Sequence, residues 1–147
     1  MANVILVYAS LSGNTEEIAE LVAEGVKSQG VLVDIKSVVE INATDLLDYD
    51  GFLLGAYTWG DGELPDEFLD FYDDMESLDL TGKKAAIFGS GDTSYPDFCA
   101  AVDILEERAK ASGADVTLPG LKVELAPEKE EKDVCRDFGK SFAATIT

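Results

Sequence analysis

The sequence contains no histidine, only two cysteines and a single tryptophan, and its 11 Lys and Arg residues are outnumbered by 30 Asp and Glu residues. The absence of histidine excludes Ser-His-Asp and Cys-His catalysis and most transition-metal sites. Cys99 and Cys135 lie far apart in the sequence and cannot form a four-ligand zinc site by themselves. The formal net charge of -19 argues against nucleic acid or an anionic membrane as a partner. It fits either a solubilising surface or attraction of a basic partner protein.

Long hydrophobic runs are also missing, because no stretch of about 18 apolar residues occurs. The first residues, MANVILVY, carry no basic segment and no small-residue cleavage site, so we expect no signal peptide. Two cysteines without a signal peptide fit a reducing compartment, and we expect a cytoplasmic location. With 147 residues, 46% of them hydrophobic, the chain is expected to form one domain, 1–147, with a sizeable core.

Short apolar runs alternate with helical patterns along the whole chain. The runs predict strands at 4–7, 31–35, 52–54, 85–88 and 116–118, with 121–125 as an open continuation of the last. Apolar residues at helical spacing predict helices around 18–26, 68–75, 102–109 and 134–142, with an optional further helix before the third strand. Strands separated by helices indicate parallel pairing with helices on both faces. The predicted class is therefore α/β, a doubly wound three-layer sandwich.

The segment ASLSGNT at 9–15 joins the first strand to the first helix. Ligands of open parallel sheets bind beyond the carboxyl ends of the strands, which makes this segment a candidate site. Gly13 allows close backbone approach, and the hydroxyls of Ser10, Ser12 and Thr15 add hydrogen-bond donors. The helix start adds backbone N–H groups and a partial positive charge of about +0.5. These neutral donors predict an anion site, and an ordinary capped helix start is the alternative.

Two common nucleotide-binding motifs are missing from this segment. Asn14-Thr15 stands where a P-loop has Lys followed by Ser or Thr, and no G-x-G-x-x-G occurs. Neither a nucleoside triphosphate nor a dinucleotide is therefore predicted.

The segments after the third and fourth strands combine glycines with aromatic residues. AYTWGDGEL at 56–64 holds Trp59, either as an aromatic platform for a planar ligand or as a structural anchor. GSGDTSYPDFC at 89–99 holds Tyr95, and Pro96-Asp97 is predicted to begin the next helix. One phosphate-binding segment and two aromatic planes predict a ligand with a phosphate at one end and a flat ring system at the other.

Over essentially its whole length the chain resembles the flavodoxins, specifically the short-chain kind. The resemblance rests on SLSGNT, which matches the pattern [ST]-x-[ST]-G-N-[ST], and on TWGDGEL and GSGDTSYPDFC in this order. It implies a five-stranded parallel sheet in the order 2-1-3-4-5 and non-covalently bound FMN as the cofactor. The insertion that interrupts the fifth strand of long-chain members is missing between Val116 and Leu125.

By position, the resemblance places the FMN phosphate on the first segment and the isoalloxazine ring between the other two. Trp59 would stack on the inner face of the ring and Tyr95 on its outer face. Ser90 to Asp92 would contact the pyrimidine end, and Phe98 and Cys99 would lie nearer the core. The implied cofactor-binding residues are Ser10, Leu11, Ser12, Gly13, Asn14, Thr15, Tyr57, Thr58, Trp59, Gly60, Asp61, Ser90, Gly91, Asp92, Tyr95, Phe98 and Cys99.

The resemblance implies an electron-transfer protein without substrate turnover of its own. The peptide of Gly60 would turn its carbonyl toward flavin N5 and so favour the neutral semiquinone. Carboxylates on or next to the ring segments would lower the semiquinone/hydroquinone potential by repelling the reduced anion. These carboxylates belong to Asp61, Glu63, Asp66, Asp92 and Asp97. The expected function is a low-potential one-electron carrier that shuttles between the neutral semiquinone and the hydroquinone of FMN and serves redox partner proteins.

The implied partners are redox proteins with basic docking surfaces. They include an NAD(P)H-flavodoxin reductase, pyruvate or hydrogenase-type oxidoreductases, and nitrogenase. We expect a monomer that binds neither nucleic acid nor a membrane.

Three other functions are considered. An FMN-dependent enzyme such as a quinone reductase would need a substrate or nicotinamide site beside the ring, whereas here two aromatic residues would cover both ring faces. A receiver-type signalling domain needs an acidic pair after the first strand and an Asp after the third, which Tyr8-Ala9-Ser10 and Ala56-Tyr57 do not supply. An interaction module would require the FMN segments to be vestigial.

Overall fold

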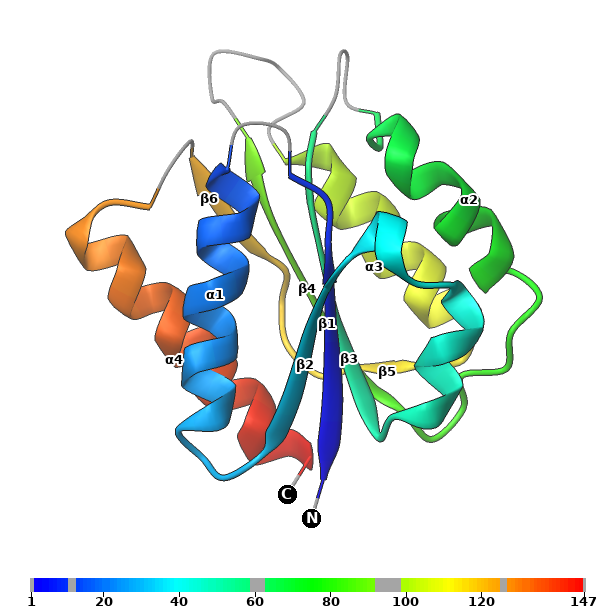
Figure 1. Cartoon of the computed structure of the whole chain (residues 1–147), viewed down its shortest axis with the longest axis horizontal. Helices are drawn as coiled ribbons and strands as arrows, with labels where there is room; N and C mark the ends of the chain where they lie inside the picture. The colour runs from blue at the N-terminus through cyan, green and yellow to red at the C-terminus, as the bar shows by residue number, and fades with distance from the viewer. Residues whose placement is uncertain (1, 11–12, 59–62, 92–98, 125–126, 147) are drawn as a thin grey trace.

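The computed structural model describes five stretches of the chain, and Figure 1 shows their arrangement. The described residues are 2–10, 13–58, 63–91, 99–124 and 127–146. In chain order the elements are β1 (Asn3–Tyr8), α1 (Asn14–Lys27), β2 (Leu32–Ser37), the 3-10 helices η1 (Val38–Glu40) and η2 (Ala43–Asp48), β3 (Gly51–Tyr57), α2 (Asp66–Met75), β4 (Lys84–Gly91), α3 (Ala100–Ala111), β5 (Asp115–Val116), β6 (Leu121–Glu124) and α4 (Lys129–Ile146). Two short 3-10 helices thus stand where the sequence left an optional helix open.

The strands form a parallel sheet in the order β2-β1-β3-β4-β5, and β6 also pairs with β4. The inner strands β1, β3 and β4 are buried along nearly their whole length, which explains their continuous apolar runs. β2 lies at the edge, where exposed residues, including Asp34 and Lys36, alternate with half-buried ones. The predicted doubly wound α/β class and the order 2-1-3-4-5 are confirmed.

The fifth strand differs from the single strand of a five-stranded sheet. Among the described residues the sheet has six strands, because the segment after α3 pairs with β4 in two parts. β5 lies beside Lys84 and Ala85, and β6 lies beside residues 88–91. Pro119 stands between the two parts and has no N–H to donate, so it interrupts the hydrogen-bond ladder. The interruption is confined to residues 117–120 and leaves the strand order unchanged.

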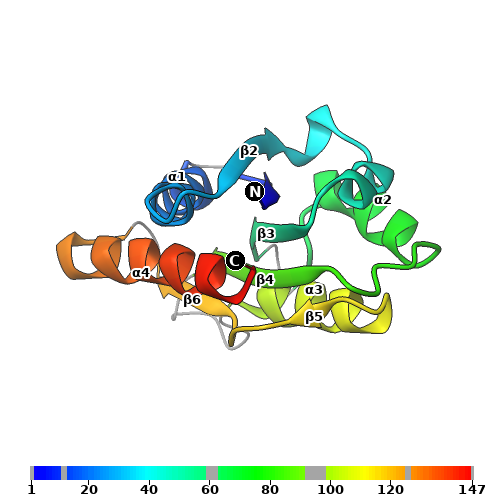
Figure 2. The same cartoon turned by 90° about the horizontal axis from the view of Figure 1, so that it is seen from below.

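Helices cover both faces of the sheet, as the view from below in Figure 2 shows. α1 and α4 lie on one face and enclose a core that includes Leu6, Phe88 and Phe142. α2, α3 and the 3-10 helices cover the other face and enclose a core that includes Phe52 and Phe68. These are the three layers that the alternating sequence pattern predicts.

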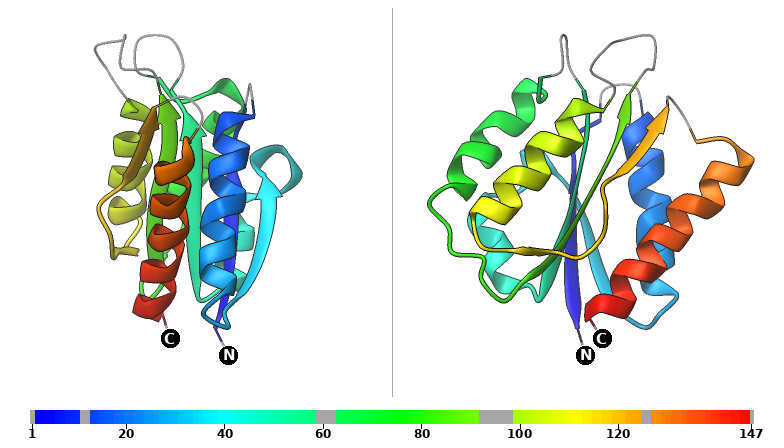
Figure 3. Two further views of the ribbon diagram at one scale, coloured as in Figure 1. Left: turned by 90° about the vertical axis from the view of Figure 1, so that its left-hand side faces the viewer. Right: turned by 180° about the vertical axis from the view of Figure 1, so that it is seen from behind.

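Both termini lie at the edge of the sheet opposite the carboxyl ends of β1, β3 and β4 (Figure 3). Within the described stretches, no helix combines the length and apolar character needed to cross a bilayer.

Candidate functional site

The carboxyl ends of β1, β3 and β4 meet at one edge of the sheet (Figure 1). Tyr8 pairs in register with Gly55, and Tyr57 pairs with Ser90, so the chain leaves the three strands at neighbouring positions. The strand order reverses between β1 and β3, and such a reversal is where doubly wound proteins bind their ligands. The three segments singled out in the sequence therefore start from the same edge.

A glycine and a serine shape the start of α1. Gly13 has a φ of 91°, in the left-handed region that glycine adopts at little steric cost. Ser10 Oγ accepts hydrogen bonds from the backbone N–H groups of Gly13 at 3.1 Å and Glu16 at 3.3 Å. Ser10 thus caps α1 from upstream, in place of a glycine that has no side chain. Both bonds use the hydroxyl as an acceptor, which leaves its O–H group as a donor.

The first turn of α1 also offers backbone donors. The first intrahelical bond runs from the N–H of Glu17 to the carbonyl of Gly13 at 3.0 Å. The N–H groups of Asn14 and Thr15 therefore precede the helical ladder and lie at the positive end of the helix dipole. The Glu17 carboxylate lies 3.5 Å from Nζ of Lys132 on α4, so part of the acidic charge at this helix end is neutralised.

Thr15 connects the start of α1 to the end of β4. Its Oγ1 lies 2.7 Å from Oγ of Ser90, and both side chains are buried. Ser90 is predicted to contact the pyrimidine end of the flavin, but its side chain lies on the face of the sheet that α1 covers. Alternation along β4 explains this placement, since Phe88, two residues earlier, packs on the same face.

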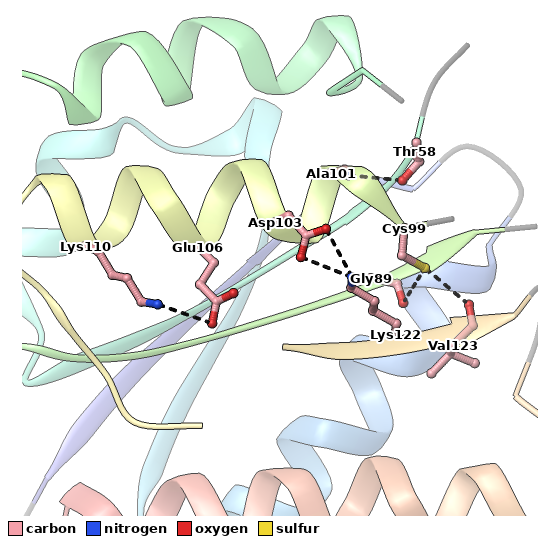
Figure 4. A network of polar contacts seen from close by, with 9 residues as sticks. All are labelled: Thr58, Gly89, Cys99, Ala101, Asp103, Glu106, Lys110, Lys122 and Val123. Atoms are coloured by element: carbon pink, nitrogen blue, oxygen red, sulfur yellow. Dashed lines mark hydrogen bonds and ion pairs between the residues drawn. The ribbon is translucent and has the colours of Figure 1, made fainter. Parts of the chain in front are cut away.

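Thr58 connects the end of β3 to α3, as Figure 4 shows. Its Oγ1 accepts a hydrogen bond of 3.2 Å from the backbone N–H of Ala101 in the first turn of α3. Cys99 precedes this helix and supplies no side-chain capping bond. Thr58, at the end of β3, therefore caps α3, the helix that follows the segment 89–99 in the chain. The predicted helix start at Pro96-Asp97 lies outside the described residues.

Cys99 is fully buried beneath the site. Its Sγ points between the carbonyl oxygens of Gly89 on β4, at 4.0 Å, and Val123 on β6, at 3.9 Å (Figure 4). Burial raises the pKa of the Cys99 thiol to about 11, and the same cause raises that of Cys135 to about 11. Both cysteines are unpaired, and at neutral pH both are buried neutral thiols that pack in the core.

Tyrosines at the ends of β1 and β3 report the electrostatic environment of this edge. Tyr8 donates a hydrogen bond of 3.0 Å to the Glu16 carboxylate, and burial together with this bond raises the pKa of Tyr8. Burial also raises the pKa of Tyr57, with further contributions from the carboxylates of Glu67 and Asp66 on α2. Around Tyr57 the edge is therefore partly desolvated and negative, so an additional anionic charge beside the end of β3 would be disfavoured.

Nine of the predicted cofactor-binding residues lie in described stretches and at this edge or directly beneath it. They are Ser10, Gly13, Asn14, Thr15, Tyr57, Thr58, Ser90, Gly91 and Cys99. The others lie outside the described residues, so the predictions for ring stacking and for the peptide turn at position 60 concern parts of the chain that the structure does not describe. These residues are Leu11, Ser12, Trp59, Gly60, Asp61, Asp92, Tyr95 and Phe98.

Sequence reasoning missed two contacts between these segments. The bond between Thr15 and Ser90 and the bond from Ala101 to Thr58 join residues far apart in the chain. One signal was available for the second contact: Cys99, directly before α3, is a poor helix-capping residue, which indicates a cap from elsewhere. The sequence carries no comparable signal for the contact of Ser90.

The donors at the start of α1 fit a phosphate group. They comprise the hydroxyls of Ser10 and Thr15 and the N–H groups of a helix start, which hold phosphates through neutral dipoles. Gly13 leaves the turn open, because a Cβ added there would meet no atom within 4 Å. Fold and site together define a doubly wound α/β protein with a candidate site for a phosphate-bearing ligand at its switch point.

Comparison with known proteins narrows this class. The family model described as flavodoxin matches residues 6–139. A probable flavodoxin 2 of Bacillus subtilis is 49% identical, covering 97% of this chain and 95% of its own, and a flavodoxin of Maridesulfovibrio salexigens is 42% identical, covering 89% and 92%. The crystal structure of oxidised flavodoxin 1 from Bacillus cereus superposes with a TM-score of 0.97 at 49% identity, covering 99% of this chain and 100% of that one.

The chain belongs to the flavodoxin family. It is accordingly an FMN-binding, low-potential electron carrier and not an enzyme, and it exchanges electrons with redox partner proteins. The cofactor, function and family that the sequence resemblance implied are confirmed.

Proposed function

We propose that FMN binds at the carboxyl edge of β1, β3 and β4, with its phosphate at the start of α1. The observation that carries this proposal is the set of neutral donors around Gly13, joined to the end of β4 through Thr15 and Ser90. Bound FMN supplies one-electron redox chemistry. The ring would lie between the segments after β3 and β4, whose residues are those implied by the family resemblance.

In this arrangement the chain binds an anion without a cation in direct contact. Ser10 and Thr15 would donate hydrogen bonds to the phosphate oxygens through their hydroxyl groups, and Asn14 through its backbone N–H. The nearby carboxylates of Glu16 and Glu17 are engaged by a tyrosine hydroxyl and a lysine, which reduces their repulsion of the phosphate.

The acidic surroundings would favour a low reduction potential. Burial and, after it, the carboxylates of Glu67 and Asp66 raise the pKa of Tyr57, and the same carboxylates would oppose a negative charge that develops in the ring on full reduction. This supports the proposal that the carrier works between the half-reduced and fully reduced states.

We further propose that redox partners dock through basic surfaces, as electrostatic complementarity to a chain of net charge -19 favours. A groove between η1 and α2 is a suitable contact, because apolar Val39, 68% exposed, lies beside the acidic residues Asp66, Glu67, Asp70 and Asp74. A basic reductase, an oxidoreductase or nitrogenase would fit this description. The two buried, unpaired thiols support a reducing, cytoplasmic setting, and we propose that the chain acts there as a monomer and a single domain, 1–147.

Titration of the apoprotein with FMN and with riboflavin, followed by quenching of flavin fluorescence, tests the proposed site. Riboflavin lacks the phosphate, so FMN should bind more tightly. Ser10→Ala should weaken FMN binding about tenfold, because a hydrogen bond to a charged group is lost, and should leave riboflavin binding nearly unchanged.

Ser28→Ala is the matched control, since Ser28 caps the opposite end of α1 and its Oγ donates to the carbonyl of Gly25. This control should bind FMN as the unaltered chain does. Equal affinity of the unaltered chain for the two flavins would refute the placement of the phosphate at α1.

A further inference from the structure

Ser90 lies in the segment that the family resemblance assigns to the flavin ring, yet its side chain is directed elsewhere. It is 4% exposed, and it faces the layer of α1, where it meets Thr15, which is 1% exposed. Ser90 pairs in the ladder with Tyr57 on one side and Val123 on the other, so its position is fixed by strands on both sides. The side chain of Ser90 therefore lies at the start of α1, where the phosphate is proposed to bind.

Only one of the two hydroxyls can donate its proton to the hydrogen bond between them. Each hydroxyl offers one donor and two acceptor positions, and in the bond between Thr15 and Ser90 one of them must accept. Among the described residues this is the one side-chain hydrogen bond that either hydroxyl makes. If Ser90 donates, the proton of Thr15 stays available for another acceptor.

We propose that Ser90 is a positioning residue that donates to Thr15 Oγ1, so that the Thr15 hydroxyl donates to the phosphate of bound FMN. This rests on the proposed function. A fully ionised phosphate at the start of α1 accepts hydrogen bonds and donates none, so it selects the orientation in which Thr15 is the donor. Burial excludes water that could compete for either hydroxyl, and the fixed position of β4 holds the acceptor side of Thr15 in place.

This arrangement links the two ends of the cofactor site. Ser90 is followed directly by Gly91, where β4 ends and the third segment begins. A phosphate bound at α1 would therefore hold β4 at the residue that leads into the ring segment. The selectivity for a phosphorylated flavin would depend in part on a residue that does not touch the phosphate.

The test measures the dissociation constants of FMN and riboflavin for single and double variants. Ser90→Ala should weaken FMN binding about fivefold, as expected for one lost hydrogen bond, and should change riboflavin binding less than twofold. Ser90→Cys fills the same space with a weak donor and serves as a second variant if Ser90→Ala folds poorly. It should also weaken FMN binding and leave riboflavin binding nearly unchanged. In a Thr15→Val background the Ser90→Ala change should alter FMN binding less than twofold, because no hydroxyl is left to orient.

Ser112→Ala is the matched control for loss of a buried serine hydroxyl. Ser112 Oγ donates to the carbonyl of Met75 at 2.7 Å, away from the carboxyl edge, and the change should leave the FMN-to-riboflavin affinity ratio unaltered.

The outcomes separate the two proposals. If the unaltered chain binds both flavins equally, the proposed phosphate site fails, and the inference about Ser90 fails with it. If the unaltered chain prefers FMN, three results would overturn only the inference about Ser90. Ser90→Ala could leave the affinity for FMN unchanged, or lower the affinities for FMN and riboflavin equally. It could also lower the affinity for FMN as much in the Thr15→Val background as in the unaltered chain.

Discussion

At the scale of single residues, Tyr49 shows how one hydrogen bond changes a titration. Its hydroxyl donates to a carboxylate oxygen of Asp34 at 2.6 Å, joining the turn before β3 to the edge strand β2. This hydrogen bond is the main cause, and burial the second, of the rise in the pKa of Tyr49 to about 12. Lys83 Nζ donates to the carbonyls of Leu47 and Tyr49 and holds the same turn from the side of β4.

The raised pKa of Tyr49 predicts a loss of stability at alkaline pH. The folded-state pKa lies above the unfolded value of 10, so the contribution is fully present below pH 10 and is lost as the pH rises toward 12. Asp34→Asn should lower the pKa of Tyr49 toward 10, as measured by tyrosinate absorbance. Asp48→Asn removes only a minor electrostatic contribution and should shift the pKa far less. An equal shift in both variants would show that the hydrogen bond is not the main cause.

At the scale of elements, the packing of α1 against α4 depends on two glycines that face the opposite helix. A Cβ at Gly25 would overlap the carbonyl oxygen of Arg136, and a Cβ at Gly139 would overlap that of Val22. The helices therefore approach backbone to backbone at these positions. This close approach packs α1 against α4 on the same face of the sheet. The start of α1 lies at the carboxyl edge of the sheet (Figure 1).

Gly25→Ala and Gly139→Ala should each destabilise the protein by about 2 kcal/mol, because the helices must separate. Helix propensity alone predicts the opposite sign, a gain of about 1 kcal/mol for Gly→Ala. Urea unfolding of the apoprotein measures the difference. Glu20→Ala, at an exposed position of α1, is the control and should change the free energy of unfolding by less than about 0.5 kcal/mol. A stabilising effect at either glycine would contradict the close approach.

At the scale of the whole molecule, we expect the net charge of -19 to govern the encounter of the carrier with its partners. Charges on the surface of such a chain act together over the Debye length, about 30 Å at 10 mM salt and about 8 Å at 150 mM. The groove between η1 and α2 combines this charge with the exposed side chain of Val39. Electron transfer to a basic partner should therefore be fast at low salt and slow as salt is added.

Asp70→Asn combined with Asp74→Asn should lower the rate of reduction of cytochrome c, a basic redox protein, by about threefold at low ionic strength and flatten its salt dependence. Glu107→Gln combined with Glu130→Gln removes the same charge at exposed positions away from the groove and should have a smaller effect. Stopped-flow kinetics of the FMN-loaded protein measure both. Equal slowing by the two double variants would indicate that only net charge matters and that the groove is not the docking surface.

How much the sequence predicts depends on whether a feature is local. Burial of whole strands produces the continuous apolar runs of β1, β3 and β4, and amphipathic periodicity marks the helices, so these elements are readable in a short window. The 3-10 helices before β3 and the break of the fifth strand at Pro119 are not readable in a short window, because they depend on which neighbour each backbone group finds.

The sequence by itself determined the α/β class and, through the family resemblance, the strand order and the cofactor, because each follows from residues close together in the chain or from a specific motif. It also predicts neutral phosphate donors at the start of α1. Only the tertiary structure decided that Ser90 meets Thr15 and that Thr58 caps α3. These contacts depend on the register of β4 beside β3 and on the placement of helices over the sheet, and neither leaves a periodic signal in the sequence.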